Sequence, residues 1–284
     1  MHIVVCIKQV PDSAQIRVHP VTNTIMRQGV PTIINPYDLF ALEEALRLRD
    51  WLGGEVTVLT MGPPMAEESL RKALGIGADR GVLLTDRFFA GSDTLATSYA
   101  LAQAVRKIGE TWGIPEIVFT GKQTIDGDTA QVGPGIARRL ALQQLTYVAA
   151  VQEVDLENKT ITVLRRAEGG VQELKTAIPA LITMLEGTNE VRRGTIADVL
   201  RGARAELVVW NAQTAGITDV SNCGLRGSPT VVKRVFAPKP RATKAVQIEV
   251  GDRDMGTIAE DVIARLYAVQ PALEAALLRT AAAY

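Results

Sequence analysis

Short apolar, β-branched runs alternate with helical segments through the first half of the chain. The strand-like runs cover residues 3–7, 56–59, 82–84 and 117–119, and the helical segments cover residues 36–52, 66–74, 94–108 and 131–142. Strands that alternate with helices pair in parallel, because each helix carries the chain back to the start of the next strand. The pattern therefore predicts an α/β fold whose ligands bind outside the carboxyl ends of the strands.

The loop after residue 119 is the most informative segment. It runs from Gly121 through two aspartates and Gly127, and a helix is expected to begin between Thr129 and Gly133. Free backbone N–H groups at a helix N-terminus favour a phosphate, whereas an acidic residue there suits a ribose hydroxyl or a cap. The loop matches neither G-x-G-x-x-G nor the P-loop pattern, so on these residues alone an ordinary polar loop with helix caps is the alternative.

The pattern changes after Thr146. Alternating strand patterns cover residues 148–156, 160–166, 171–176 and 180–185, with turns at Asn158-Lys159 and Gly169-Gly170. Such hairpin signals predict antiparallel strands added to the parallel sheet.

The composition excludes several function classes. The 31 basic and 31 acidic residues leave no net charge, which is not typical of a nucleic-acid or membrane-surface binder. Cys6 and Cys223 form no C-x-x-C pair and His2 and His19 have no metal-ligand spacing, so no metal site or histidine triad is expected. No apolar run is long enough to span a bilayer, and the first strand leaves no room for a signal peptide. We therefore expect a soluble, cytoplasmic protein.

The C-terminal region contains a basic, proline-rich segment. Residues 226–248 include six cations and no acid, with prolines at 229, 238 and 240. Such a segment cannot build its own core, so it is either a solvated linker or a strap across a partner. A last helix is expected at residues 256–269. We divide the chain into a nucleotide-binding domain at residues 1–210 and, at residues 211–284, an arm and helix that pack on a partner subunit.

The hairpin region also carries a long spaced pattern. It reads Val163-x-Arg165-x-x-Glu168-Gly169-Gly170-x-Gln172-x-Leu174, followed by Pro179-x-Leu181-Ile182-Thr183. This pattern resembles, position for position, the signature of the electron transfer flavoprotein β subunit. Residues 121–126, Asn35-Pro36, Met61-Gly62 and residues 77–80 fall where that family has its adenine-nucleotide segments. The resemblance implies a parallel-sheet adenine-nucleotide-binding domain similar to the adenine nucleotide alpha hydrolases.

Two branches of this family differ at the nucleotide. In the simpler branch the β subunit holds AMP as a structural component, whereas in the bifurcating branch it holds a second FAD and accepts electrons from NADH. Residues 86–101, 126–134 and 223–238 are similar to the bifurcating branch, and the whole chain most resembles its FixA-type members, which are associated with nitrogen fixation.

The resemblance implies three sets of site residues. The set implied for FAD or AMP is Cys6, Asn35, Met61, Asp93, Thr94, Thr97, Gly121, Lys122, Gln123, Thr124, Asp126, Gly127, Asp128, Thr129, Ala130, Gln131 and Val132. The set implied to face NAD is Arg87, Phe88, Ala90 and Gly91. Partner recognition is implied for Ile196, with Arg192 and Arg193 beside it, and the alternative for residues 185–206 is an amphipathic helix that packs on its own domain. No side chain is expected to act as acid, base or nucleophile, because the flavin carries the chemistry.

These expectations combine into a hypothesis. The chain would pair with an electron transfer flavoprotein α subunit, bind FAD and, only within that complex, oxidise NADH. The electrons would go separately, through the α-subunit FAD to a quinone-oxidoreductase-like flavoprotein with a ferredoxin-like subunit, and to ferredoxin or flavodoxin for nitrogen fixation. Any membrane association would come through these partners. Two alternatives stay open: a non-bifurcating β subunit with structural AMP, and a stand-alone nucleotide-binding α/β protein.

Overall fold

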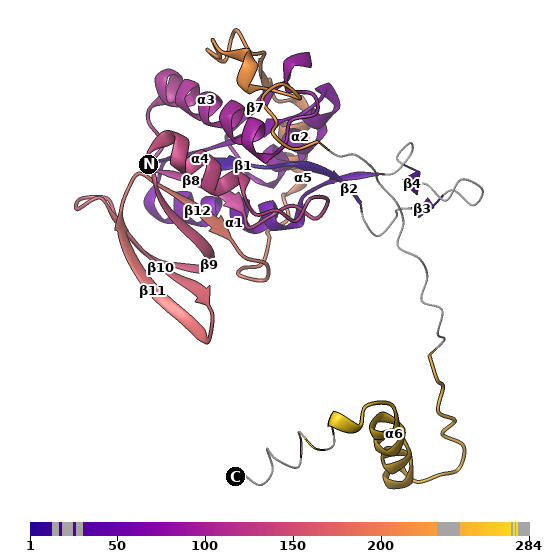
Figure 1. The fold of residues 1–284 in the computed structure, drawn as a ribbon. Coiled ribbons are helices and arrows are strands. Elements are labelled where there is room, and N and C mark those ends of the chain that lie inside the picture. Colours follow the sequence, from indigo (N-terminus) through magenta and orange to yellow (C-terminus); the bar gives the residue numbers. More distant parts are fainter. Residues whose placement is uncertain are drawn as a thin grey trace. The chain divides into compact units, whose positions relative to one another are not determined.

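The computed structural model describes residues 1–12, 17–18, 25–26, 31–231, 245–273, 275 and 277. Two compact units are present, Met1–Ala237 and Pro238–Tyr284. The first unit contains a nine-stranded sheet with helices on both faces (Figure 1). This arrangement confirms the predicted α/β fold.

The strands of the large sheet follow the order β11-β10-β9-β12-β8-β1-β6-β7-β13. The strands are β1 (His2–Cys6), β6 (Glu55–Met61), β7 (Arg80–Leu84), β8 (Ile117–Gly121), β9 (Gln143–Asp155), β10 (Thr160–Ala167), β11 (Gly170–Ala177), β12 (Ala180–Met184) and β13 (Val208–Trp210). All neighbours from β9 to β13 in this order pair in parallel, and only β10 and β11 are antiparallel. The strand expected at residues 180–185 therefore lies inside the parallel part of the sheet.

The spaced signature pattern falls on β10, β11 and β12. Its two glycines form the turn of a hairpin that extends to the lower left in Figure 1, and Gly169 and Gly170 have φ angles of 81° and 155° there. Only glycine adopts such angles without strain, so the turn explains why the pattern has two glycines at these positions. Two further antiparallel pairs join β2 (Gln9–Pro11) to β5 (Thr32–Ile34) and β3 (Arg17–Val18) to β4 (Ile25–Met26).

Four helices cover the two faces of the sheet. Helices α1 (Pro36–Leu52) and α2 (Glu67–Ile76) pack on one face, and α3 (Thr94–Trp112) and α4 (Val132–Leu140) pack on the other. Successive side chains of a strand point to opposite faces. In β1, Ile3 and Val5 accordingly belong to the α1 and α2 core, whereas Val4 and Cys6 belong to the α3 and α4 core.

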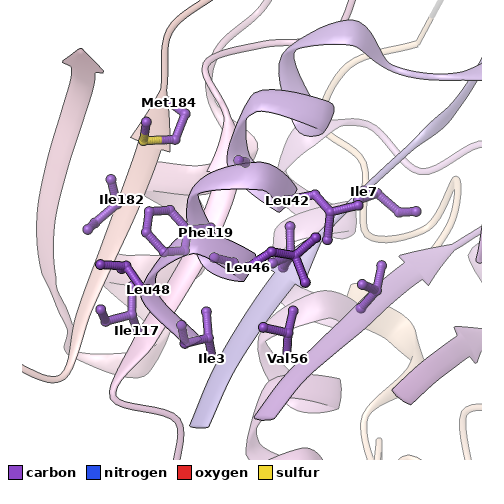
Figure 2. Close-up of a cluster of buried hydrophobic side chains, with 14 of the residues drawn as sticks. Ile3, Ile7, Leu42, Leu46, Leu48, Val56, Ile117, Phe119, Ile182 and Met184 are labelled. Carbon is purple, nitrogen blue, oxygen red and sulfur yellow. The ribbon is translucent and has the colours of Figure 1, made fainter. Parts of the chain in front are cut away.

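The larger core lies between α1 and the centre of the sheet. Figure 2 shows Ile3, Phe119 and Ile182 from three neighbouring strands gathered against Leu42 and Leu46 of α1. All five side chains are fully buried. Burial of apolar surface stabilises a fold by about 25 cal/mol per Å². This contact is therefore a main source of the stability of the fold.

The sequence prediction did not include strands β2, β3, β4, β5 and β13, and it gave a helix at residues 185–206 only as the alternative to partner recognition. Helix α5 (Ile196–Arg204) begins with a capping box between Thr195 and Asp198, and it packs on α2. Its contact is close because a Cβ on Gly202 would lie 2.6 Å from the carbonyl oxygen of Arg71. Strand β13 follows and pairs with the edge strand β7.

Residues 211–231 pack on the same unit. Trp210 stacks on Trp112 of α3 at a centroid distance of 5.7 Å, and Ile217 and Cys223 are buried in the core beneath α3. The α/β unit extends to Ala237. The boundary at residue 210 was drawn because residues 211–284 were expected to pack on a partner subunit, and that expectation stays a prediction.

The second unit contains α6 (Met255–Val269), close to the predicted bounds. None of its residues is buried. Most of the predicted arm, residues 232–244, lies outside the described residues. In the part of the chain that the structure describes, no helix is both long and apolar enough to cross a membrane.

Candidate functional site

The loops singled out by the sequence meet at one edge of the sheet. Because β1, β6, β7 and β8 are parallel, their carboxyl ends lie along the same edge, as predicted. Hydrogen bonds join the loops that follow β1 and β8, and one from Thr94 to Gln131 joins the start of α3 to the loop after β8. The structure therefore brings most of the implied nucleotide set together.

An ion pair connects the loop after β1 to the loop after β8. The Lys8 Nζ atom lies 2.9 and 2.8 Å from the two carboxylate oxygens of Asp126. Desolvation by burial acts to raise the pKa of Asp126, but hydrogen bonds from Lys8 and Thr124 outweigh it and hold this pKa below its usual value. The charge of Asp126 is thus compensated within the chain, which removes an obstacle to binding an anion nearby.

Asn35 holds the same loop from the start of α1. Its side chain is fully buried, its Nδ2 atom donates to the carbonyl oxygen of Gln123 at 2.9 Å, and its Oδ1 atom accepts from the Ile125 N–H at 3.2 Å. The side chain that the resemblance implied for the cofactor is therefore engaged with the backbone of the loop. In this structure Asn35 positions the site.

Asp38 is a buried residue of the site that the sequence analysis missed. Its carboxyl oxygens accept the Lys8 N–H at 2.8 Å and the Gly121 N–H at 3.1 Å, so it joins the ends of β1 and β8. Burial raises the pKa of Asp38 to about 7, against the opposing effect of these backbone hydrogen bonds. An acid in the first turn of a helix is common, and only its burial distinguishes this one.

Gly121 lies against the start of α1. A Cβ atom at this position would lie 2.5 Å from the Asp38 Oδ1 atom and 2.6 Å from the Tyr37 Cβ atom. Such distances are too short for non-bonded atoms, so glycine is required for the loop after β8 to approach α1 this closely. Gly121 thus shapes the site through packing.

The loop itself has an unusual backbone. Asp128 and Ala130 are in the left-handed region, with φ angles of 51° and 54°, whereas Gly127 is not. A Cβ on Gly127 would be 3.5 Å from its nearest neighbour, Thr124 Oγ1, so the chain alone leaves room for a side chain there. Left-handed residues other than glycine are uncommon and concentrate at binding sites.

The N-terminus of α4 has the features of a phosphate site. Its N-cap residue, Gln131, makes no side-chain capping bond and Pro134 has no N–H, so the N–H groups of Val132 and Gly133 are the two donors without a side-chain acceptor there. The Gln131 Oε1 atom instead accepts from Thr94 Oγ1 at 2.8 Å, and Gln123 donates to Asp128 at 2.8 Å. Residues 126–129 are exposed to solvent. The donors and hydroxyls of this loop fit an adenine nucleotide with its phosphates.

Two glycines place α4 close to its neighbours. A Cβ on Gly133 would lie 2.8 Å from Thr120 Oγ1, and one on Gly135 would lie 2.6 Å from Ser98 Oγ. Gly133 lets α4 approach the sheet, and Gly135 lets it approach α3. The close contacts at these two glycines therefore fix the position of the start of α4 relative to the sheet and to α3.

Several other implied residues have different surroundings. Cys6 is buried in the core, and burial raises the pKa of its thiol to about 12, so it stays protonated. The Lys122 ammonium lies 4.9 Å from the Tyr37 ring centroid and 3.4 Å from Glu186. Met61 and Val132 pack against the core beneath α3, and Thr97 is half-buried on α3. Asp93 is the N-cap of α3 and accepts from the Leu95 and Ala96 N–H groups.

The residues implied to face NAD lie in the loop after β7. Arg87, Ala90 and Gly91 are exposed, and 53% of the surface of Phe88 is accessible. A shallow pocket of about 380 Å³ lies between Phe88 and residues 211–220. The segment is accessible to a ligand, and its contact with NAD stays a prediction.

The residues implied for partner recognition divide into two kinds. Ile196 is 82% exposed at the start of α5, and Arg193 is exposed beside it. Arg192, by contrast, donates to Glu43 at 2.9 Å and to Asp50 at 2.6 Å, and the hydrogen bonds with Glu43 raise its already high pKa. Arg192 therefore holds the segment before α5 against α1, and Ile196 presents an apolar side chain to solvent.

Comparisons with known proteins agree with this architecture. A family model described as the electron transfer flavoprotein domain matches residues 22–215. A Protein FixA of Sinorhizobium fredii is 71% identical over 280 residues, which cover 99% of this chain and 98% of the relative. A Protein FixA of Azotobacter vinelandii is 64% identical over 281 residues, with coverages of 99% and 100%. An electron transfer flavoprotein subunit beta of Clostridium acetobutylicum is 44% identical over 268 residues, with coverages of 94% and 98%. The chain therefore belongs to the electron transfer flavoprotein family, as a β-subunit chain of the FixA type.

Proposed function

We propose that the chain is the β subunit of an electron-bifurcating flavoprotein. In this proposal it binds FAD at the carboxyl edge of its sheet, pairs with an α subunit and accepts electrons from NADH. The observation that carries the proposal is the loop with exposed residues 126–129, which precedes a helix N-terminus without a side-chain cap. The same geometry would serve the adenine nucleotide of either branch of the family.

The resemblance to the bifurcating branch supports FAD over AMP. It rests on residues 86–101, 126–134 and 223–238, and the high identity to proteins named FixA agrees with it. We accordingly propose that the electrons serve nitrogen fixation. One electron would pass through the α-subunit FAD to a quinone-oxidoreductase-like flavoprotein with a ferredoxin-like subunit, and the other to ferredoxin or flavodoxin.

The residues present have separate tasks in this proposal. The backbone from Gly127 to Val132 and the hydroxyls of Thr124, Thr129 and Thr94 would hold the nucleotide. Lys8, Asn35 and Asp38 hold the loop in place. Arg87 would supply a fixed positive charge beside the ring system. Bound FAD supplies the redox chemistry, since it can exchange electrons in pairs and singly.

The partner surfaces are proposed on separate elements. Helix α6, with Met255, Ile263, Leu266 and Val269 all exposed, would pack on the α subunit together with the basic arm. Ile196 on α5, with exposed Val199 and Leu200 one turn along the helix and exposed Arg193 before it, would dock the electron acceptor. Exposed apolar residues beside a charged one have the composition of an interface hot spot.

A substitution at Gly127 tests the nucleotide site. Because the chain itself leaves room there and Gly127 has no left-handed φ, Gly127→Val should fold normally and clash only with a bound nucleotide. We expect the β-chain flavin to be lost, the α-chain flavin to stay, and bleaching of the protein by NADH to slow. Gly109→Val is the matched control, because Gly109 also has no left-handed φ and a Cβ there would lie 3.5 Å from its nearest neighbour, at the end of α3 away from the loop after β8.

The measurement is flavin and AMP content per heterodimer, with the rate of flavin reduction by NADH. A wild-type heterodimer with two flavins supports the proposal. One flavin with one AMP would establish the non-bifurcating alternative. Two flavins and full NADH reactivity in Gly127→Val would place the nucleotide at another edge or loop.

A further inference from the structure

The segment at residues 223–230 is bonded directly to the start of α3. The Asp93 N–H donates to Ser228 Oγ at 2.8 Å, and Thr230 Oγ1 donates to Asp93 Oδ2 at 2.8 Å. The Thr230 N–H donates to the same carboxylate oxygen at 3.2 Å. Ser228 thus holds the backbone of Asp93, and Thr230 holds its side chain. Ser228 lies 135 residues further along the chain.

The backbone of this segment is also fitted closely to the loop after β7. Gly224 has a φ of 57°, its N–H donates to Ser92 Oγ at 3.0 Å, and a Cβ there would lie 2.3 Å from the Phe88 carbonyl oxygen. Ser228 is buried and its hydroxyl donates back to the Gly224 carbonyl oxygen at 2.7 Å. Residues 223–230 therefore have one defined position against this loop.

Asp93 connects residues 223–230 to the loop after β8. Its Oδ1 atom accepts the Leu95 and Ala96 N–H groups, while its Oδ2 atom accepts from Thr230. Desolvation acts to raise its pKa, but these hydrogen bonds outweigh that effect and hold the pKa below its usual value. The next residue, Thr94, donates to Gln131, the N-cap of α4.

We propose that Ser228 and Thr230 are positioning residues for the nucleotide site, acting through Asp93, Thr94 and Gln131. They fix the first turn of α3, which fixes the Gln131 side chain and thereby the loop that is to receive the phosphates. The inference rests on the proposed function only in taking the carboxyl edge as an adenine-nucleotide site. It adds that the C-terminal segment takes part in forming that site.

The test uses the heterodimer with Thr230→Val, which removes one hydroxyl from an exposed position and keeps the backbone N–H. Ser228→Ala is the second variant. Thr230→Val should weaken binding of FAD by about fivefold, as expected for one lost hydrogen bond, and Ser228→Ala, which removes two hydrogen bonds, should weaken it at least as much. Ser221→Ala is the matched control, because Ser221 lies just before residues 223–230 and donates only to Asp219. Thr230→Ser should restore the affinity, because it returns the hydroxyl.

A double-mutant cycle separates positioning from general stability. In a Gln131→Ala background the path to the loop is broken, so Thr230→Val should have no further effect on affinity. Affinities are measured by fluorescence titration with FAD and with AMP as separate probes. If the β chain takes AMP and no FAD, the proposed function fails, and the AMP affinities still test the role of Ser228 and Thr230. A Ser228→Ala, Thr230→Val double variant that binds both probes as tightly as Ser221→Ala would overturn the inference.

Discussion

The Lys8 ammonium and the Asp126 carboxylate, 118 residues apart, form an ion pair at 2.8 Å. The pair joins the first loop of the chain to the loop that precedes α4. Both side chains are partly accessible, at 46% for Lys8 and 34% for Asp126, so the pair contributes little to overall stability. Its importance lies in the charge that it cancels beside the proposed phosphate position.

Lys8→Gln should lower the affinity of the β chain for FAD and leave the fold intact. Without the ammonium, Asp126 carries an uncompensated negative charge beside the nucleotide phosphates. We expect a loss of about tenfold at low ionic strength, shrinking as added salt screens the repulsion. Flavin titrations at two salt concentrations measure it. Lys72→Gln on α2, which breaks an exposed pair with Glu68, is the control.

Asp38 should make the stability of the chain depend on pH between about 4 and 7. Its pKa is about 7 in the folded chain and has its ordinary value of 3.8 when unfolded. Between these values only the folded state holds the proton, so the free energy of unfolding falls by up to about 1.4 kcal/mol per pH unit as the pH rises.

Asp38→Asn should remove this slope, because the amide does not titrate in that range. The variant should also lose an acceptor for one of the two backbone N–H groups, at a cost of about 1 kcal/mol at pH 5. Urea denaturation at pH 5, 6 and 7 gives both quantities. Equal slopes in the variant and the wild type would show that Asp38 does not carry the pH dependence.

Gly121→Ala should destabilise the protein even without nucleotide. The added Cβ would lie 2.5 Å from Asp38 and 2.6 Å from Tyr37, both in the first turn of α1. Displacing that turn should cost about 1–3 kcal/mol of unfolding free energy. Gly127→Ala is the matched control with its nearest neighbour at 3.5 Å, and it should unfold like the wild type. Thermal unfolding of both variants decides the matter.

Ile196→Ala should slow electron transfer to the quinone-oxidoreductase-like partner without changing flavin content or stability. The side chain is 82% exposed, so its loss leaves no cavity in the chain. Removing an interface anchor weakens a complex by about 2 kcal/mol or more. Ile114→Ala, with a side chain that is 76% exposed in the turn between α3 and β8, should leave transfer unchanged. Reduction kinetics with the partner at several concentrations measure the difference.

A chain that ends at Val231 should pair poorly with the α subunit and still form the nucleotide site. It keeps the contacts of Ser228 and Thr230 with Asp93 and loses the basic segment beyond. A chain that ends at Val209 also loses Trp210, Ile217 and Cys223 from the core, so its nucleotide binding should fail as well. Copurification with a tagged α subunit, and nucleotide content, distinguish the two truncations.

The sequence predicted the parts of the fold that depend on local patterns. The apolar runs at β1 and β8 could be identified directly from the sequence. Helix α5 was only an alternative prediction, because its apolar residues Ile196, Val199 and Leu200 face solvent and do not indicate a contact with the core. The three residues of β13 form a strand only because β7 offers an edge, which is a contact between distant segments.

The site was predicted in the same uneven way. The loop from Gly121 to Val132 was recognised from its own residues, whereas Asp38 looked like any acid in a first helical turn. Arg192 shows that a sequence does not reveal the partner of a charged residue. It was assigned to a partner surface, but in the structure it pairs with Glu43, 149 residues away. A sequence shows the type of a residue and its neighbours along the chain, and it does not show which distant group will take its charge.

The bond between Asp93 and Thr230 has a consequence for the order in which the protein is made. Most strands of the sheet and the loop that is to hold the nucleotide are complete by Met184, yet one of their supports is supplied by residues 223–230. On the ribosome, the sheet can assemble while the C-terminal segment is still in the exit tunnel. Under the proposed positioning role, the tightest binding of a nucleotide would therefore follow the emergence of residues 223–230 from the tunnel.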